Sequence, residues 1–375
     1  MRTNLIKNEK YSHLLIIERR NALKSKAIFK FGVIALSIVL VACSGGSSDE
    51  AGCPAIEDRK INVVATTPMI GEFVNQVGGD SINLTVIMPA EADPHTYEPA
   101  PQDAGTIADA DLVFYTGLKY EPAAVVKLLE SSACSTDVLA EVGENVYPIE
   151  FKEGGHDDHG DHDEEGHDDD EEGHDDDEEG HDDDEEGHDD HDGHEGHGHG
   201  AYDPHFWFDP NRVVYAAEYI EAKLVEFDPS NASSYKEAGS AYADELKGLT
   251  GQVSDLISTV PSQNRKLITT HESLGYLEAK FGLEVLSTII PSLDSANEIS
   301  PSQLVDVIDV IEDNNVKVIF IESEAPSVYA ETIVSETGIK AVEGLWVETL
   351  KEGQSYPDFL ISAVELIVEN LRNTD

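Results

Sequence analysis

The chain has 375 residues, of which 40% are hydrophobic and 27% are charged, and its formal net charge at pH 7 is −52. This length exceeds the size of one comfortable hydrophobic core, so two domains are predicted. The strongly negative charge repels the phosphates of nucleic acids and argues against DNA or RNA as partners.

Residues 1–42 are interpreted as a lipoprotein signal peptide. Several basic residues precede the apolar run FGVIALSIVLVAC, which is too short for a good membrane span. The run ends in LVAC, which resembles a bacterial lipoprotein signal and makes Cys43 the lipidated residue; a plain signal peptide with an incidental cysteine is the alternative. Residues 43–59 then form a polar tether. We therefore expect an extracytoplasmic protein of the cell envelope, anchored to a membrane by lipid.

Three cysteines occur in the chain. With Cys43 assigned to lipidation, Cys53 and Cys134 remain. Because an oxidising compartment favours pairing, a Cys53–Cys134 disulfide is predicted, with two unpaired thiols as the alternative.

Strand-like and helix-like patterns alternate along residues 60–228, which we assign to an N-terminal α/β lobe. The predicted strands are 61–67, 82–89, 111–117 and 146–151, and the predicted helices are 68–79, 101–110 and 121–132. Such alternation predicts βα units and a parallel sheet.

Residues 155–200 interrupt this lobe with a His/Asp/Glu-rich tract that has a seven-residue period. No apolar residue fills any position of the repeat, so a coiled coil is excluded and a disordered surface loop is predicted. Its imidazoles are partly protonated at neutral pH, and ordering the loop costs entropy, so each site should bind metal weakly. We predict a metal-collecting loop, with a solvated acidic spacer as the alternative. The loop histidines are His156, His159, His162, His167, His174, His181, His188, His191, His194, His197 and His199.

A single long helix is predicted over residues 229–260, where good helix formers carry apolar residues at i, i+3 and i+4. About 30 residues at 1.5 Å each form a rod of roughly 45 Å, which would join two lobes as a spine. Residues 261–375 then repeat the alternation as a C-terminal α/β lobe. Its predicted strands are 265–270, 283–290, 316–323 and 340–347, and its predicted helices start at 271, 300, 325 and 356.

Only three histidines lie outside the signal region and the tract: His95, His205 and His271. Each lies at the edge of a strand or loop, and the ends of parallel strands are where α/β folds bind ligands. Neutral imidazole is the commonest zinc ligand. Any one of these histidines alone would be interpreted as packed or hydrogen-bonded, but all three together predict a metal site. A helix starting at His271 would place this ring in a positive dipole field that keeps it neutral.

Three segments, DPHTYEPAPQD, DPHFWFDP and THESLGYLEAKFGLE, carry these histidines. With them the chain resembles the metal-binding solute-binding proteins of bacterial ABC importers, in particular the high-affinity zinc uptake (ZnuA-like) family. The resemblance extends over residues 60–375 and implies two α/β lobes with parallel β-sheets flanked by helices. It also implies a long rigid helix between the lobes, with metal held in the interlobe cleft by His95, His205 and His271.

The fourth ligand is less directly implied by the resemblance. The family has an aspartate, or a water, where this chain offers Glu348 in GLWVETL, so Glu348 and a water are both open as ligands, and a solvated loop carboxylate is the alternative for Glu348. Manganese-binding relatives have a carboxylate at the position of His271, so this histidine favours Zn²⁺ over Mn²⁺.

Residues beside these motifs have simpler interpretations. Phe206 and Trp207 are expected to pack around the cleft. Glu98 and Asp209 are candidates to hydrogen-bond the ligand imidazoles, or to cap loops. Glu272 is expected to cap its helix together with Thr269 in a Thr-x-x-Glu capping box.

These expectations describe a zinc-binding lipoprotein that captures extracytoplasmic Zn²⁺ and delivers it to an ABC permease, as a monomer and without catalysis. A zinc hydrolase is one alternative, because three histidines and an open position also describe catalytic zinc, although no His-Glu-x-x-His helix is present. A cell-adhesion protein that uses zinc for folding and a manganese transporter are the others.

Overall fold

The computed structural model describes residues 53, 56, 59–151, 202–292, 297–324 and 327–372. All of them lie in the second of two units into which the chain divides, Ala51–Asp375. The predicted signal peptide, Cys43 and the histidines of the tract lie outside the described residues. The bounds predicted for the tether, the lobes and the linking segment stay predictions.

The first sheet has four parallel strands in the order β2-β1-β3-β4. They are β1 (Ile61–Ala65), β2 (Ile82–Val86), β3 (Leu112–Tyr115) and β4 (Leu139–Glu141). The helices that alternate with them are α2 (Pro68–Gly78), α3 (Pro101–Ala108) and α4 (Ala123–Ser132). Thr67 begins α2 as its cap, since its hydroxyl accepts the Ile70 N–H at 3.2 Å. We call this sheet, with α2, α3, α4 and the later helix α5 (Pro210–Phe227), the N-terminal lobe.

The strand predicted over 146–151 is wrong, and the fourth strand is β4 instead. Tyr147 has a left-handed φ of 55°, and Pro148 has no N–H to donate to a ladder. Arg212 donates to the Val146 carbonyl oxygen at 3.0 Å, so this backbone is held by a side chain. All that remains of extended pairing here is one antiparallel bridge between Glu150 and Tyr202, which joins the two ends of the described chain on either side of the tract.

The second sheet repeats the topology of the first, in the order β6-β5-β7-β8. Its parallel strands are β5 (Lys266–Thr269), β6 (Glu284–Thr288), β7 (Val318–Glu322) and β8 (Lys340–Leu345). Three helices alternate with them: α7 (Gly275–Phe281), α8 (Pro301–Asp313) and α9 (Ala330–Thr337). We call this sheet, with α7–α9, the C-terminal lobe.

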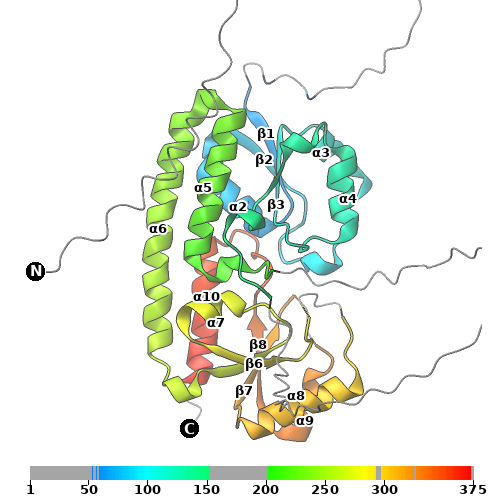
Figure 1. The fold of residues 1–375 in the computed structure, drawn as a ribbon, viewed down its shortest axis with the longest axis vertical. Helices are drawn as coiled ribbons and strands as arrows, with labels where there is room; N and C mark the ends of the chain where they lie inside the picture. Colours follow the sequence, from blue (N-terminus) through cyan, green and yellow to red (C-terminus); the bar gives the residue numbers. More distant parts are fainter. Residues whose placement is uncertain are drawn as a thin grey trace, which may run out of the picture. The chain divides into compact units, whose positions relative to one another are not determined.

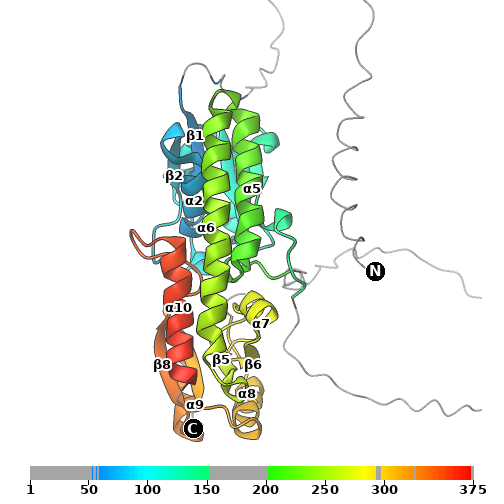
Figure 2. The same cartoon turned by 90° about the vertical axis from the view of Figure 1, so that its left-hand side faces the viewer.

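Three longer helices complete the fold: α5 (Pro210–Phe227), α6 (Ala232–Ser258) and α10 (Tyr356–Leu371). The 27 residues of α6 extend over roughly 40 Å, and α6 packs against α2, α5, α7 and α10 (Figures 1 and 2). Helix α6 therefore contacts elements of both lobes, as expected of the linking helix. Helix α5 was not predicted, although Asp209 caps it and it buries one apolar face.

Both sheets are covered on both faces, which explains their runs of β-branched residues. Along β1, Val63 packs into the largest buried cluster, with α2, α5, α6 and α10, and Val64 packs into a smaller one on the opposite face. Along β7, Phe320 joins the largest cluster and Ile319 a second one under α8 and α9. The predicted fold class, two parallel α/β lobes joined by a long helix, is confirmed.

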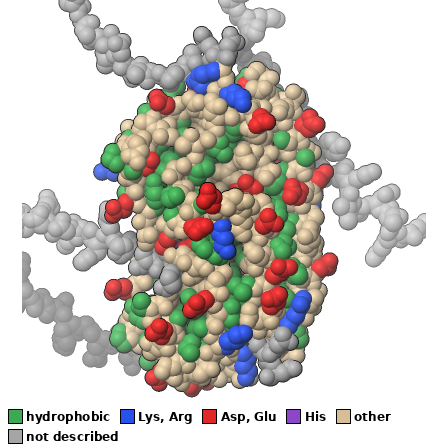
Figure 3. Space-filling view, turned by 180° about the vertical axis from the view of Figure 1, so that it is seen from behind, with side chains coloured by type: hydrophobic (Ala, Val, Ile, Leu, Met, Phe, Trp, Pro, Cys, Tyr) green, Lys and Arg blue, Asp and Glu red, His purple; other side chains and the backbone are tan. Residues whose placement is uncertain are grey.

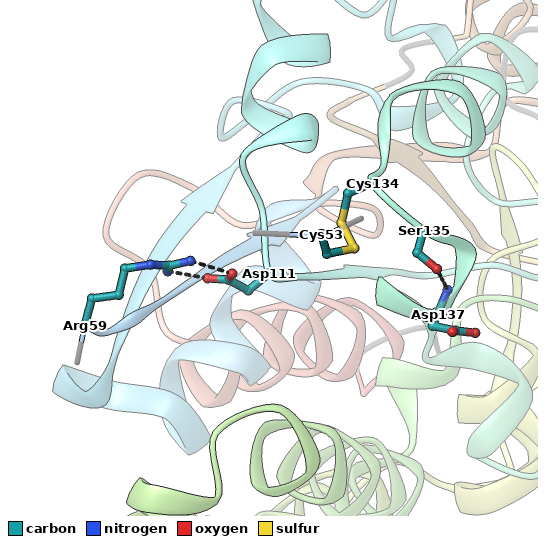
Figure 4. Close-up of a disulfide and its surroundings, with 6 residues drawn as sticks. All are labelled: Cys53, Arg59, Asp111, Cys134, Ser135 and Asp137. Carbon is teal, nitrogen blue, oxygen red and sulfur yellow. Dashed lines mark hydrogen bonds and ion pairs between the residues drawn. A yellow bond between two sulfur atoms is a disulfide. The ribbon is translucent and has the colours of Figure 1, made fainter. Parts of the chain in front are cut away.

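The beginning of the described chain is fastened to the N-terminal lobe at two points (Figure 4). A disulfide joins Cys53 to Cys134, beyond the end of α4, and Arg59 forms two charge-assisted hydrogen bonds of 2.5 and 2.7 Å with Asp111. None of the described helices combines the length and apolar character needed to cross a membrane. On the face drawn in Figure 3, acidic side chains are spread among apolar and polar ones.

Candidate metal centre

His95 lies in the loop that follows β2. It belongs to a short 3₁₀ turn, Pro94–Thr96, and the Asp93 carboxylate accepts the backbone N–H of His95 at 2.9 Å. The Asp-Pro-His segment therefore sets the direction of the backbone at His95. The imidazole packs edge-on to the ring of Tyr120, with centroids 5.2 Å apart.

His205 lies at the second Asp-Pro-His segment, directly before the 3₁₀ turn Phe206–Phe208 that precedes the cap of α5, and is fully buried. Its backbone N–H and its ring Nδ1 both lie 2.8 Å from Oδ1 of Asp203. The carbonyl oxygen of Asp203 in turn accepts the hydroxyl of Tyr276 at 2.8 Å. With Nδ1 engaged by the carboxylate, Nε2 is the ring nitrogen of His205 that is available to a metal.

His271 follows β5 and is also fully buried. Its Nδ1 contacts Oε2 of Glu322, the last residue of β7, and its backbone N–H donates to Oε1 of the same carboxylate at 3.3 Å. The hydroxyl of Ser273 donates to Oε1 at 3.2 Å. His271 therefore has an outer carboxylate partner like that of His205, but this partner comes from another strand.

Two expectations about the surroundings of His271 are wrong. Helix α7 begins at Gly275, so His271 lies in the loop before it rather than in its first turn. Thr269 donates to the carbonyl oxygen of His271, and Glu272 accepts from the Thr288 hydroxyl at 3.4 Å, so these two residues form no capping box. A neighbouring strand, rather than a helix, fixes this imidazole.

Glu348 lies in the loop after β8 and is fully buried. Its Oε1 lies 3.5 Å from Nε2 of His95, 3.1 Å from Nε2 of His205 and 2.6 Å from Nε2 of His271. One ligand atom from each of the four residues lies within 4.8 Å of all the others. The structure thus brings the four residues singled out in the sequence into one cluster.

Tyr120 reaches the same carboxylate from the N-terminal lobe. Its hydroxyl lies 2.8 Å from Oε2 and 3.1 Å from the carbonyl oxygen of Glu348. Burial, together with the negative charge of Glu348, raises the pKa of Tyr120 well above its usual value, so the hydroxyl keeps its proton and donates.

The backbone that presents Tyr120 is unusual. Gly117, Leu118 and Lys119 have consecutive left-handed φ values of 76°, 54° and 63°, which are unfavourable for the two that are not glycine. The buried carboxylate of Glu121 stabilises this turn, since it accepts the Gly117 N–H at 2.9 Å. The hydroxyl of Thr66 also donates to Glu121 at 2.7 Å, which ties the turn to the end of β1.

The electrostatics of the cluster favour an anionic carboxylate among cationic imidazoles. Burial disfavours the charge on His205, but the carboxylates of Glu348 and Asp203 outweigh burial and raise the pKa of His205 to about 9. The pKa of His271 is raised well above its usual value in the same way, against burial, by Glu322 and Glu348. Burial alone would favour the neutral form of Glu348, but the charges of His205, His95 and His271 hold its pKa well below the usual range.

The donor set fits a transition metal of the zinc type. Three imidazole nitrogens and one carboxylate oxygen are the ligands expected around four-coordinate zinc. Within the described chain, the buried Nε2 atoms of His95 and His271 have no hydrogen-bond partner in good geometry, as expected of atoms reserved for another ligand. A cation at the cluster would replace the protons that the imidazoles hold.

Several residues that support the cluster were not identified from the sequence. Asp203 and Glu322 bond the ligand imidazoles, whereas the predicted partners do not: Asp209 accepts the Asn211 N–H as the cap of α5, and Glu98 is exposed. The Asp203 signal was present, since it is the aspartate of the second Asp-Pro-His segment. Trp207 is buried as predicted, and its indole N–H also donates to the Val347 carbonyl oxygen at 2.8 Å.

Comparisons with known proteins identify a family and relatives of this chain. A family model described as "Zinc-uptake complex component A periplasmic" (ZnuA) matches residues 63–370. The manganese ABC transporter substrate-binding lipoprotein PsaA of Streptococcus mitis is 26% identical, over 89% of this chain and 95% of that protein. The zinc-binding lipoprotein AdcA of Streptococcus pneumoniae is also 26% identical, over 90% of this chain and 59% of that protein.

The fold is similar to that of a solved structure. The periplasmic zinc-binding protein TroA from Treponema pallidum superimposes with a TM-score of 0.65 at 20% sequence identity, covering 84% of this chain and 100% of that one. At this level of identity, the likeness establishes the two-lobe fold.

Proposed function

The chain belongs to the family of periplasmic zinc-uptake complex component A proteins, and from this premise we propose that it captures extracytoplasmic Zn²⁺ and delivers it to an ABC permease. Its relatives include substrate-binding proteins of metal ABC importers, so it is a metal-binding transport protein and not an enzyme. Binding and release are then ligand exchange at the cluster of His95, His205, His271 and Glu348.

The observation that carries the proposal is the convergence of three imidazole Nε2 atoms on one buried carboxylate oxygen. Burial of four polar groups at one point is costly unless they share a charged ligand or protons. Outer carboxylates orient two of the imidazoles, an arrangement that raises the basicity of a metal ligand. The site is therefore built to hold a cation firmly while charge and hydrogen bonds keep the ligands in place.

Manganese is the second candidate cargo, because PsaA is named as a manganese transporter protein. The donor set favours zinc, since imidazole suits Zn²⁺ whereas carboxylate, carbonyl and water oxygens suit Mn²⁺. Three nitrogens against one carboxylate at the cluster support the assignment of zinc, and AdcA is named as a zinc-binding lipoprotein.

The lipid anchor and the tract complete the proposal. We assign the anchor to Cys43, supported by the LVAC segment and by relatives that are named lipoproteins. The histidines and carboxylates of the tract gather cations at low affinity, and the chain re-enters the described structure at Tyr202, three residues before His205. Local enrichment by dense negative charge would speed loading of the cluster.

The test is a competition between metals. Two proteins lacking residues 155–200, one wild type elsewhere and one carrying His95→Ala, are incubated with equal zinc and manganese, dialysed and analysed for metal. One tight zinc equivalent is expected in the first and little in the second. Retention of manganese instead of zinc would overturn the choice of metal, and equal zinc in both proteins would overturn the site.

A further inference from the structure

The loop that carries Glu348, residues 346–355, leaves the sheet of the C-terminal lobe, yet much of its bonding is to the N-terminal lobe. The indole N–H of Trp207 donates to the Val347 carbonyl oxygen at 2.8 Å. The hydroxyl of Tyr120 reaches both the carbonyl oxygen and the carboxylate of Glu348. Two donors of the N-terminal lobe, the Trp207 indole N–H and the Tyr120 hydroxyl, thus bond the ligand and its preceding residue.

The second half of this Glu348 loop is also bonded to the N-terminal lobe. The backbone N–H of Glu91, in the N-terminal lobe, donates to the Leu350 carbonyl oxygen at 3.2 Å. The loop ends at Tyr356, which is fully buried, donates its hydroxyl to the Trp207 carbonyl oxygen at 2.6 Å and packs edge-on to Phe73 of α2. Helix α10, which Tyr356 begins, packs mainly on α6 and also on β7 and β8 of the C-terminal lobe. The N-terminal lobe therefore bonds the loop at its middle and at its last residue, whereas α10 itself contacts both the linking helix and the second sheet.

The C-terminal lobe holds the same loop through Glu324, just beyond β7. Its Oε1 accepts the backbone N–H groups of Val347 and Glu348 at 3.0 Å each and of Thr349 at 3.3 Å. All three of these hydrogen bonds depend on one oxygen of one side chain. The bonds between the loop and the N-terminal lobe are instead distributed over Tyr120, Trp207, Glu91 and the buried Tyr356. Separation of the lobes should therefore break the hydrogen bonds to Glu324 first.

The four candidate ligands divide accordingly. His95 and His205 belong to the N-terminal lobe, although the Tyr276 hydroxyl of α7 donates to the Asp203 carbonyl oxygen beside His205. His271 is bonded to Glu322 of β7 and so belongs with the second sheet. We propose that Glu348 stays with His95 and His205 when the lobes separate, and that His271 alone withdraws from the metal. This inference rests on the proposed function as a metal carrier.

A three-to-one division has a direct consequence for release. Withdrawal of one ligand leaves the cation on two imidazoles and a carboxylate with an open position, where water or a ligand from the permease can enter. The permease then has to displace a single imidazole in the first step, rather than two ligands at once. A site that holds metal tightly can in this way release it through a small motion.

The experiment measures distances between pairs of nitroxide-bearing amino acids, introduced without cysteine so that the disulfide stays intact. The labels replace three exposed residues: Glu130 on α4, Glu312 on α8 and Glu352 in the Glu348 loop. Pulsed electron paramagnetic resonance on the zinc-free protein measures the distance between two labels. The distance distribution should be narrow for labels at positions 130 and 352, and broad for the pairs 130 with 312 and 312 with 352. Zinc should narrow the two broad distributions and leave the first unchanged.

Matched variants remove separately the bonds that the Glu348 loop makes with the N-terminal lobe and those that it makes with Glu324. Tyr120→Phe combined with Trp207→Phe should broaden the 130–352 distribution, whereas Glu324→Ala should leave it narrow, with thermal melts confirming that each variant is folded. In the zinc-free parent protein, a broad distance distribution between labels 130 and 352 with a narrow one between labels 312 and 352 would overturn the proposal. Three narrow distance distributions, with and without zinc, would also overturn it. Metal analysis of the same samples tests the proposed function separately, because a failure to bind zinc leaves the zinc-free distances interpretable.

Discussion

The two lobes support their histidines in different ways, although their sheets have the same strand order. In the N-terminal lobe, His205 is oriented by Asp203, which is two residues away in the chain. In the C-terminal lobe, His271 is oriented by Glu322, which is 51 residues away on a neighbouring strand. The first arrangement is a local motif that the chain carries wherever the motif folds, and the second exists only once the sheet has formed. Two similar carboxylate–imidazole pairs can thus depend to different degrees on the fold around them.

The largest expected effect is the loss of a ligand from either lobe. His205→Ala or His271→Ala should weaken zinc binding by more than the roughly 10–100-fold that loss of an outer partner costs, because the ion loses one of about four bonds. Titration against a competing chelator measures the change. Near-native affinity in both variants would contradict the site, and a circular dichroism spectrum like that of the parent serves as the folding control.

Replacing the outer carboxylates compares the two arrangements directly. Asp203→Asn and Glu322→Gln should each reduce zinc affinity by about 10–100-fold, since each keeps the shape but loses the charge that orients an imidazole. The Glu322 variant should also lower the free energy of unfolding more, because this carboxylate bonds the backbone N–H and the ring Nδ1 of His271 and also accepts from the Ser273 hydroxyl. Denaturant unfolding measures the loss of stability in each variant. Equal losses would argue against the inference that the Glu322–His271 pair depends more on the folded sheet than the Asp203–His205 pair does.

The pH dependence should have opposite signs for zinc binding and for the stability of the zinc-free protein. The folded pKa of His205 is about 9, above an unfolded value of about 6.5, so its contribution to stability is complete below pH 6.5 and is lost as the pH rises toward 9. Zinc must displace the same proton, so apparent zinc affinity should rise over this range.

Calorimetry in two buffers of different ionisation enthalpy measures the protons released on zinc binding. Release should be larger at pH 6.5 than at pH 9. In the His205→Ala variant, this difference should shrink. Zinc binding without any release of protons at pH 6.5 would contradict the charge state assigned to the cluster.

The smallest expected effect on tight binding follows from removing the tract. Deletion of residues 155–200 should abolish several weak zinc equivalents and leave one tight equivalent with its affinity little changed, because the described cluster contains no tract residue. Equilibrium dialysis over a wide range of zinc concentration separates the two classes. Loss of the tight equivalent with the fold preserved would show that the tract supplies a ligand.

The same contrast between local and long-range structure explains what the sequence could predict. The alternating apolar runs were sufficient to predict the two parallel lobes. The positions of His95, His205 and His271 at strand edges in distinctive motifs were sufficient to identify them as candidate ligands. The strand predicted over 146–151 was wrong, although Pro148, which cannot donate to a ladder, was visible in the sequence. The apolar pattern gave no sign that Arg212 would hold the Val146 carbonyl oxygen.

The residues around the ligands were less accessible. Asp203 could have been identified from its place in the Asp-Pro-His segment. Glu322 had a weaker signal, as a charge at the end of a buried apolar strand. Tyr120 and Glu324 had none, because their roles arise from contacts with Glu348 over separations of 228 and 24 residues.

The Cys53–Cys134 disulfide also limits how far the carrier can travel. On the proposal that Cys43 carries the lipid, about ten residues separate the lipid from the disulfide, and at roughly 3.5 Å each they reach at most about 35 Å. A short linker of this kind holds a binding module at an effective concentration in the millimolar range. Delivery then becomes an encounter within a thin layer above the bilayer, in which the number of carriers around each permease sets the rate of uptake.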